Sequence, residues 1–448
     1  MTSERTSPAT RQSDDTGHGS LVILALLALL VGAAAGAVGA LFRLCLEQAD
    51  RWRDAAVGWA HGHSLLGFVL VLGGGAVCAA LAVWLVRRFS PHASGSGIPH
   101  VEAVLRRELA PAPYILLPVK FVGGVLAIGS GLALGREGPS VQMGATVAHA
   151  VADLARRSWP DCRVLIAAGA GAGLATAFNA PIAGAIFVLE ELVQRFERRI
   201  AIAALAASAT AIAVARAIIG DAPDFVLPPL DHIAPLGQPL FIVLGVVAGL
   251  LGIAYNRTLL GTLALFDRLG RWPVELRAAA VGMSVAVVVW FAPGLVGGGD
   301  ALTQRALSGA EPLLLLPLIF LLRALMGAVS YAAGTPGGLF APLLVLGAQM
   351  GLMFGVACAW LFPGLALTPA AFAVVGMAAF FTGVVRAPLT GIVLITEMTA
   401  AFTLLLPMLG ACFAAMLVPT LLRDAPIYDS LRERTLQRDR QPGGRSST

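Results

Sequence analysis

Long apolar runs alternate with short polar segments along most of the chain. About 20 apolar residues are needed to cross a bilayer as a helix. Runs that reach or approach this length cover residues 21–41, 64–86, 200–220, 239–262, 276–292, 312–330, 343–362 and 403–422. The pattern therefore predicts an all-α polytopic membrane protein.

Shorter apolar segments, interrupted by glycine and proline, lie between these runs. They cover residues 113–134, 139–155, 163–177, 181–193, 370–383 and 388–399. Segments of this length are typical of half-helices or re-entrant helices, whose free ends must be satisfied inside protein rather than in lipid. Residues 1–20 are polar and predict a disordered tail. The run at 21–41 is longer than a signal-peptide core and no small-residue cleavage site follows, so it predicts a first membrane helix.

The two halves of the chain match each other at two nearly equal offsets. An offset of 203 aligns Lys120, Gly135, Pro139 and Gly144 with Arg323, Gly338, Pro342 and Gly347, and an offset of 207 aligns Gly169, Pro181 and Glu190 with Gly376, Pro388 and Glu397. Paired, Gly/Pro-interrupted segments in two halves indicate a substrate site near the middle of the membrane. We predict a first membrane repeat at 21–220, a proline-rich linker at 221–240, a second repeat at 241–430 and a charged tail at 431–448. The letters leave open whether the repeats are parallel or inverted.

Composition narrows the class of protein further. The chain is 57% hydrophobic and 13% charged, whereas soluble domains carry about 25% charged residues, so a large soluble enzyme is excluded. The net charge of +5 comes from arginines in short loops, which indicates membrane topology rather than nucleic-acid binding. The five cysteines are not spaced as zinc ligands are, and we interpret His61 and His63 as loop residues. We therefore expect no metal site and no cofactor.

The segment GSGIPH (95–100) has the composition of a helix start that approaches a ligand. Gly95 and Gly97 allow close backbone approach, Pro99 suits the first helical turn, and Ser96 offers a hydroxyl. Exposed amides at such a start form an anion site. An ordinary turn before an amphipathic helix is the alternative.

Short helices also start at FNAP (178–181) and RAPLTG (386–391), where we expect amides that can face an anion.

The segment GREGP (135–139) places Glu137 at membrane depth. A lone ionised carboxylate there is costly and tends to take a proton, whereas helix N-terminal amides favour its charged form. Ionisable residues inside membranes are functional by default. We therefore predict that Glu137 is a proton-coupled switch. The alternative is a simple ion pair with Arg136 or Lys120.

The repeat partner of GREGP is GGLFAP (337–342), where Phe340 takes the position of Glu137. The predicted site is therefore asymmetric, with one titratable carboxylate facing the backbone amides of Leu339 and Phe340. Plain core packing explains the Phe340 side chain equally well.

Two acids end the segment that starts at Pro181. Glu190 aligns with Glu397, which indicates a structural role shared by both repeats. Glu191 aligns with Met398, so its carboxyl group is particular to the first half. An interfacial anchor is the alternative for both acids.

These motifs together resemble the CLC family of chloride channels and chloride/proton antiporters. GSGIP, GREGP, GGLFAP and a late tyrosine in PIYDSL (426–431) occur in the family's order and rough spacing, and the resemblance covers about residues 21–430. It implies an all-helical fold with two inverted repeats and many tilted, broken helices. It also implies a homodimer with one ion pathway per subunit.

The resemblance implies a chloride site with defined residues. Ser96 and Tyr428 would offer hydroxyls to a central chloride, and backbone amides around Leu339 and Phe340 would complete that site. The amides near Glu137 would line an outer site.

The resemblance also implies two proton-handling residues. Glu137 matches the family's gating glutamate, whose carboxylate competes with chloride and moves away when protonated. Glu191 matches the internal proton-transfer glutamate of the antiporter branch.

One departure from the family pattern is His100, which follows GSGIP where a glutamate is common. The regulatory nucleotide-binding modules of many eukaryotic members are absent, so regulation by ATP through them is not expected.

We therefore expect a secondary active transporter that exchanges chloride for protons across the inner (plasma) membrane, and not an enzyme. Its expected partners are chloride ions, protons and the lipid bilayer, with no nucleic acid. A passive voltage- or pH-gated chloride channel of the same fold is the alternative, although a channel has no need of Glu191. A serine hydrolase built on Ser96 would need a base, and no acid is placed to orient His100. If the protein were only a scaffold, the free-energy cost of placing the Glu137 carboxylate at membrane depth would serve no function.

Overall fold

The computed structural model describes residues 9–221, 224–228 and 235–440, and these residues form helices and loops without a strand. The helices of the first half are α1 (Ala9–His61), α2 (Ser64–Phe89), α3 (Ile98–Leu105), α4 (Leu116–Gly129), α5 (Glu137–Leu154), α6 (Trp159–Phe178), α7 (Pro181–Phe187) with the π-helical turn η2 (Val188–Leu192), and α8 (Arg198–Ile219). Those of the second half are α9 (Gln238–Arg268), α10 (Val274–Phe291), α11 (Asp300–Leu307), α12 (Leu316–Ala332), α13 (Phe340–Leu361), α14 (Pro369–Val385), α15 (Pro388–Thr399), α16 (Leu405–Leu421) and α17 (Ile427–Arg440).

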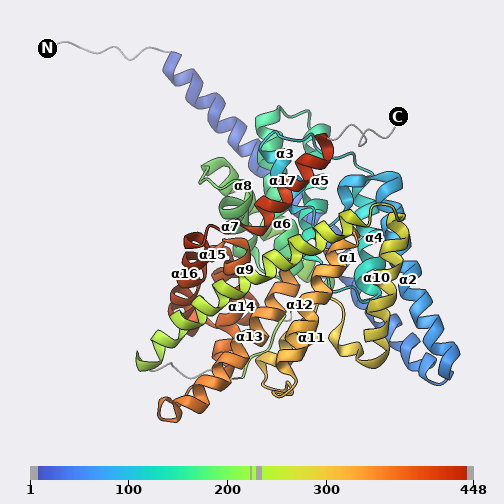
Figure 1. Cartoon of the computed structure of the whole chain (residues 1–448). Helices are drawn as coiled ribbons and strands as arrows, with labels where there is room; N and C mark the ends of the chain where they lie inside the picture. The colour runs from blue at the N-terminus through green and yellow to red at the C-terminus, as the bar shows by residue number, and fades with distance from the viewer. Residues whose placement is uncertain (1–8, 222–223, 229–234, 441–448) are drawn as a thin grey trace.

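The helices pack into one body in which long and short helices are mixed (Figure 1). Helix α1 begins and α17 ends on the same side of the molecule, which we name the termini face, and α17 packs there against α3. The turn between α1 and α2 lies on the opposite side. Within the described residues, eight helices are long and apolar enough to cross a membrane. The prediction of an all-α, multi-pass membrane protein is confirmed.

The bounds of several helices differ from those expected. Helix α6 covers 20 residues rather than the short segment 163–177, because Ser158 is extended at the N-cap and Pro160 fits the first turn. Helix α12 has 17 residues, fewer than the run at 312–330. Helix α1 starts at Ala9 and continues to His61, well beyond residue 41. Residues 1–8, 441–448 and parts of the linker (222–223 and 229–234) lie outside the described residues, so the domain division stays a prediction.

The same close helix crossing occurs in both halves. A Cβ on Gly144 of α5 would lie 2.2 Å from the carbonyl oxygen of Gly169 of α6. The aligned pair repeats this contact, since a Cβ on Gly376 of α14 would lie 2.4 Å from the carbonyl oxygen of Gly347 of α13. Glycine is needed at these positions because the two backbones touch.

Buried cations also repeat. Nζ of Lys120 on α4 donates to the carbonyl oxygens of Ala93 and Gly95, at 3.0 and 2.7 Å. Arg323, its counterpart on α12, donates to three carbonyl groups of a loop that precedes a short helix in the same way, those of Leu295, Gly297 and Gly298. Each half therefore holds one loop with a buried cation.

Two carboxylates link the halves reciprocally. Glu190, at the end of α7, accepts hydrogen bonds from the first amides of α15, those of Leu389 (3.0 Å) and Thr390 (2.6 Å). Glu397, near the end of α15, accepts hydrogen bonds from the first amides of α7, those of Ile182 (3.0 Å) and Ala183 (2.8 Å). The end of each helix thus lies at the start of the other, so α7 and α15 run in opposite directions, as inverted repeats require. The structural role expected for Glu190 is confirmed.

Replacing Gly376 by valine should destabilise the protein, because its Cβ would lie against the backbone of α13. We expect a loss of about 1–3 kcal/mol, measured as a lower midpoint of thermal unfolding in detergent. The matched control is Gly73→Val on α2, where a Cβ would meet no atom within 4 Å. Equal midpoints for the two variants would contradict the close crossing.

Candidate functional site

Three loops that are far apart in the sequence are joined by hydrogen bonds inside the molecule. Gly135 and Gly338 exchange two backbone hydrogen bonds of 2.9 and 2.7 Å. Gly95 donates to the carbonyl of Thr335 at 3.1 Å and accepts from the amide of Gly337 at 3.0 Å. Because α3, α5 and α13 start directly after these loops, their N-termini converge on one region.

Glycines at the helix starts allow this convergence. Gly97 is the N-cap of α3 with φ of +85°, and a Cβ there would lie 2.2 Å from Oε1 of Gln142. A Cβ on Gly138 would lie 2.6 Å from Oγ of Ser96. Larger residues would push the start of α3 away from the start of α5.

The hydroxyls of Ser96 and Tyr428 lie near each other at this point. Both residues are fully buried. Oγ of Ser96 accepts the amide of Ile98 at 3.4 Å, whereas the Tyr428 hydroxyl has no hydrogen-bond partner. A buried hydroxyl without a partner is costly, so this region is suited to a ligand that accepts a hydrogen bond.

Phe340 forms one wall of the region. It is fully buried, and the centroid of its ring lies 4.6 Å from that of Phe381, 5.7 Å from that of Phe187 and 6.0 Å from that of Tyr428. Its side chain is thus part of the core, as the packing alternative predicted. Leu339 is the N-cap of α13 and is also fully buried.

Glu137 is the first residue of α5 and has no exposed surface. One carboxylate oxygen accepts the amide of Ala341, in the first turn of α13, and the other oxygen has no partner. A Cβ on Gly135 would lie 2.0 Å from the carboxylate, so a larger residue there would push the Glu137 side chain out of this position. The carboxylate therefore occupies an anion position at the N-terminus of α13. Ala341 was not expected from the sequence, where repeat alignment pointed to its neighbours.

The alternative ion pairs of Glu137 are not formed. Arg136 is directed to Asp300 at 3.3 Å and lies 3.9 Å from Asp224, and Lys120 is bound to the two carbonyl groups described above. Glu137 is thus a buried carboxylate held by backbone amides.

The two adjacent acids after α7 point to different partners. Glu190 caps α15, whereas the buried Glu191 lies near Glu102 and Asp429. The helix starts at FNAP and RAPLTG do face an anion, but the anion is a carboxylate of the protein itself. The first amides of α7 and α15 are already bound by Glu397 and Glu190.

A charged network at the termini face holds α17, which carries Tyr428. Arg432 contacts Glu102 at 3.2 Å and Glu108 at 2.8 Å, and Arg106 contacts Glu102 at 2.7 Å. Partial burial lowers the pKa of Arg432, but its hydrogen bond to Glu108 and the nearby carboxylates outweigh burial and raise that pKa above its usual value. This network positions Tyr428. It was not predicted from the sequence, because its members lie on α3, on the loop directly after α3 and on α17, which are far apart in the chain.

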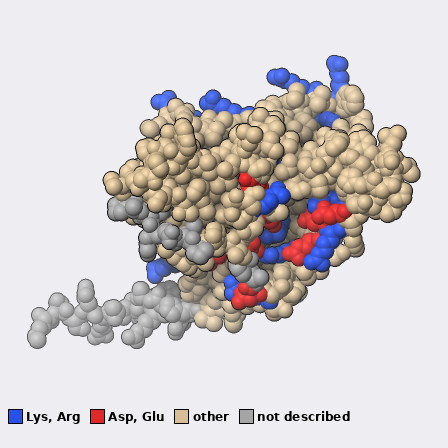
Figure 2. Space-filling view, turned by 90° about the horizontal axis from the view of Figure 1, so that it is seen from below, with Lys and Arg blue, Asp and Glu red and all other residues tan. Residues whose placement is uncertain are grey.

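The face opposite the termini is hollowed and charged. Figure 2 shows acidic and basic side chains gathered in the hollow, surrounded by uncharged residues. A cavity of about 490 Å³ on this side is lined by Asp50, Arg53, Asp54 and Asp300. Because Asp300 also pairs with Arg136, this cavity lies next to the start of α5.

Comparisons with known proteins identify the family of the chain. The family model described as voltage gated chloride channel matches residues 78–420. The chain belongs to the CLC family. A CLC protein of Vibrio parahaemolyticus, the H(+)/Cl(-) exchange transporter ClcA, is 37% identical over 430 residues, which cover 93% of the chain and 90% of that relative. ClcA of Salmonella arizonae is 37% identical over 421 residues, which cover 92% of the chain and 88% of the relative.

A solved CLC structure has the same fold. The crystal structure of a slow cyanobacterial Cl⁻/H⁺ antiporter is similar with a TM-score of 0.88 and 32% identity, and the match covers 93% of the chain and 99% of that protein. The all-helical fold predicted from the family resemblance is confirmed.

Arg432→Met should destabilise the docking of α17, because it leaves the buried carboxylate of Glu102 with Arg106 alone. We expect a loss of about 3 kcal/mol, read from thermal unfolding in detergent. Adding Glu102→Gln to this variant should restore much of the loss, since the fully buried charge is removed and the charges left without it, those of Arg106 and Glu108, are partly exposed to water. An unchanged unfolding midpoint in Arg432→Met would show that the network does not hold α17.

Proposed function

We propose that the protein is a secondary active transporter that exchanges chloride for protons. The proposal is carried by the carboxylate of Glu137, which is bound at the start of α13 through one oxygen and has no partner for the other. A carboxylate bound by backbone amides occupies the kind of position that a chloride ion bound by amides would occupy. The Glu137 carboxylate and chloride can therefore compete for one position. The exchange named for the ClcA relatives supports the same assignment.

The anion binds between Ser96 and Tyr428 in this proposal, with the backbone amides of Leu339 and Phe340 completing its shell. Chloride must lose water to cross, and partial charges of amides and hydroxyls replace part of its hydration. Full positive charges would hold the ion too tightly for release. The nearby cations Lys120 and Arg136 are directed to carbonyl groups and carboxylates, which supports binding by partial charges.

Glu137 is the gate. When it is charged, it occupies the amides of α13 and excludes chloride. When it takes a proton, it loses most of its attraction to those amides and leaves the position to chloride. Because the two states exclude each other, movement of chloride and of protons is linked.

Glu191 passes the proton toward the termini face. Its support is its position beside the charged network of Glu102 and Asp429, while the neighbouring Glu190 is bound as a helix cap. We propose that this face is cytoplasmic and that the membrane is the bacterial inner membrane.

A homodimer is the proposed assembly. Helices α7, α8, α15 and α16 carry apolar side chains with large exposed surfaces, including Ile182 (53%), Leu205 (53%), Leu389 (55%) and Phe413 (67%). Light scattering of the detergent-solubilised protein should give the mass of two chains. The mass of one chain would contradict the dimer.

Exchange can be tested in liposomes that contain the purified protein and a chloride gradient, with membrane potential set by a potassium ionophore. We expect chloride to drive protons against their own gradient, recorded as a change in external pH. Chloride flux without proton movement would overturn exchange and leave the passive channel.

Two substitutions test the two glutamates in the same assay. Glu137→Gln should abolish coupling, because the side chain can no longer titrate. Glu191→Gln should stop proton flux and spare chloride flux. The control is Glu433→Gln, an exposed acid of α17, which should exchange like the unmodified protein. Proton pumping by Glu191→Gln would show that this assignment is wrong.

A further inference from the structure

A large apolar groove lies at the end of the molecule opposite the termini face, since its lining reaches Trp59 and Ala60 beside the turn between α1 and α2. Its volume is about 560 Å³, and helices α1, α2, α4 and α10 form its walls. Most of the lining is apolar or small, as at Ala56, Leu70 and Val125. Volumes of this size are typical of sites that hold a small organic ligand. We name it the outer groove.

The open side of the outer groove faces the bilayer. Trp52 and Trp59 line the groove and have large exposed surfaces, and exposed tryptophans are typical of the depth at which a membrane meets water. The lining of α1 runs from Cys45 to Ala60, about 22 Å along the helix axis, which is about half of a bilayer with its head groups. Figure 1 shows α2 and α10 on the side of the molecule away from α15 and α16, so the proposed dimer leaves the groove accessible.

The protein leaves this space unfilled. A Cβ on Gly75 would lie 2.8 Å from the carbonyl oxygen of Gly282, so α2 and α10 touch there, whereas a Cβ on the neighbouring Gly74 would meet no atom within 4 Å. Water does not fill apolar cavities readily, and empty space beside apolar side chains forfeits their dispersion contacts. Inside a bilayer, the molecule available to fill the groove is a lipid acyl chain.

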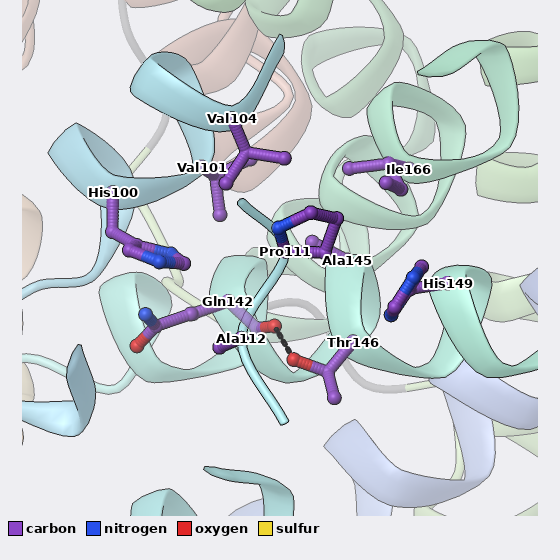
Figure 3. A pocket seen from close by; sticks show the side chains of 10 residues that line it. All are labelled: His100, Val101, Val104, Pro111, Ala112, Gln142, Ala145, Thr146, His149 and Ile166. Atoms are coloured by element: carbon purple, nitrogen blue, oxygen red, sulfur yellow. Dashed lines mark hydrogen bonds between the residues drawn. The ribbon is translucent and has the colours of Figure 1, made fainter. Parts of the chain in front are cut away.

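A second cavity in the first half of the chain is unsuited to an acyl chain. This cavity, shown in Figure 3, has a volume of about 20 Å³, which is room for about one water molecule. Its lining includes the polar side chains of His100, Gln142 and Thr146. Size and polarity therefore distinguish the outer groove from it.

Charged residues lie at one end of the outer groove. Arg53 lines both the groove and the charged cavity of about 490 Å³. Its guanidinium contacts Asp50 at 2.6 Å and Asp54 at 3.0 Å, and 48% and 58% of these two side chains remain exposed. One cation balances one of the two carboxylates, and Asp300 in the same cavity is paired with Arg136. A negative charge is therefore left where the groove meets water.

We propose that the outer groove binds one phospholipid with an ethanolamine head group. One acyl chain fills the space between the apolar walls, and the head-group ammonium lies at Asp50 and Asp54. This ammonium has a positive charge and N–H donors, as lysine has, so it both balances the carboxylates and donates hydrogen bonds to them. The indole N–H groups of Trp52 and Trp59 and the amide of Gln48, which also line the groove, donate to the phosphate and ester oxygens.

The negative charge discriminates between lipid head groups. Phosphatidylglycerol has a net negative charge and is repelled by Asp50 and Asp54. The quaternary ammonium of phosphatidylcholine is positively charged but has no N–H to donate. The lipid site is additional to the proposed exchange and does not depend on it.

The experiment is native mass spectrometry of the delipidated, detergent-purified protein with added dioleoyl phospholipids that differ only in head group. We expect one phosphatidylethanolamine per chain to bind about threefold to fivefold more tightly than phosphatidylglycerol, the effect of one partly exposed charge, with phosphatidylcholine between them. The double variant Asp50→Asn, Asp54→Asn should lose this preference and still bind lipid. Glu433→Gln, on α17 at the termini face, should keep the preference.

A bulkier residue tests the groove itself. Gly74→Leu should fill the groove and remove the bound lipid with any of the three head groups. The matched control is Gly73→Leu, because a Cβ on Gly73 also meets no atom within 4 Å but lies outside the lining of the groove. This control should bind lipid as the unmodified protein does. Size-exclusion profiles identify variants that fail to fold.

The native thiols report where the lipid lies. Cys45 and Cys78 line the outer groove, whereas the buried Cys162 lies outside it. The reaction of these thiols with a hydrophobic maleimide is followed by peptide mass spectrometry. Added phosphatidylethanolamine should slow the reaction of Cys45 and Cys78 and leave that of Cys162 unchanged.

Several results would overturn the lipid site. These are equal binding of the three head groups, binding that Gly74→Leu leaves unchanged, and reaction of Cys45 and Cys78 that is unaffected by lipid. Tightest binding of phosphatidylcholine would also contradict it, since it would indicate cation–π contacts with Trp52 and Trp59 instead of hydrogen bonds to carboxylates. Protection of the two thiols that rises with protein concentration in the absence of lipid would show that a second copy of the chain covers the groove.

Discussion

Helices that begin inside an apolar molecule leave backbone N–H groups that water does not reach, and each needs an acceptor. The protein meets this need with carboxylates. Glu397 and Glu190 bind the first amides of α7 and α15 and link the two halves. Glu137 binds an amide of α13 in the same manner. What separates Glu137 from the other two is that one of its oxygens is buried without a partner.

The binding of a carboxylate to the first amides of a helix therefore has two roles in this protein, one structural and one proposed for gating. Each of the caps Glu190 and Glu397 binds two backbone amides, so both act as structural links between the repeats. Glu137 makes one hydrogen bond to the facing helix, α13, whereas each structural cap makes two to the helix it faces, so fewer contacts between the repeats are lost when the Glu137 side chain leaves. A removable cap at a helix start is equivalent to an anion site with its own internal anion, which is what a gate requires.

Glycine contacts make such an arrangement possible. The crossings of α5 with α6 and of α13 with α14 bring backbones into direct contact, and they hold the helices that begin at the site in place. The loops around Gly95, Gly135 and Gly338 are joined by backbone hydrogen bonds, so the N-termini of α3, α5 and α13 cannot move independently. Rigid placement matters because partial charges bind an anion well only when they already point at it.

Local patterns in the chain were sufficient to predict the membrane class, the repeats, helix α15 within its observed bounds (388–399), and the position of Glu137 inside the apolar molecule, where it is fully buried. Tyr428 was singled out only through the family resemblance. The length of an apolar run and its interruption by glycine or proline can be read from neighbouring residues. Internal repeats can be found by aligning the chain with itself. The partners of these residues could not be predicted in this way. That Glu137 binds Ala341, and that Glu397 and Glu190 occupy the starts of α7 and α15, follow from how separate segments pack. A helix start in a sequence predicts free amides, but the fold determines which carboxylate, hydroxyl or ion lies within reach of them.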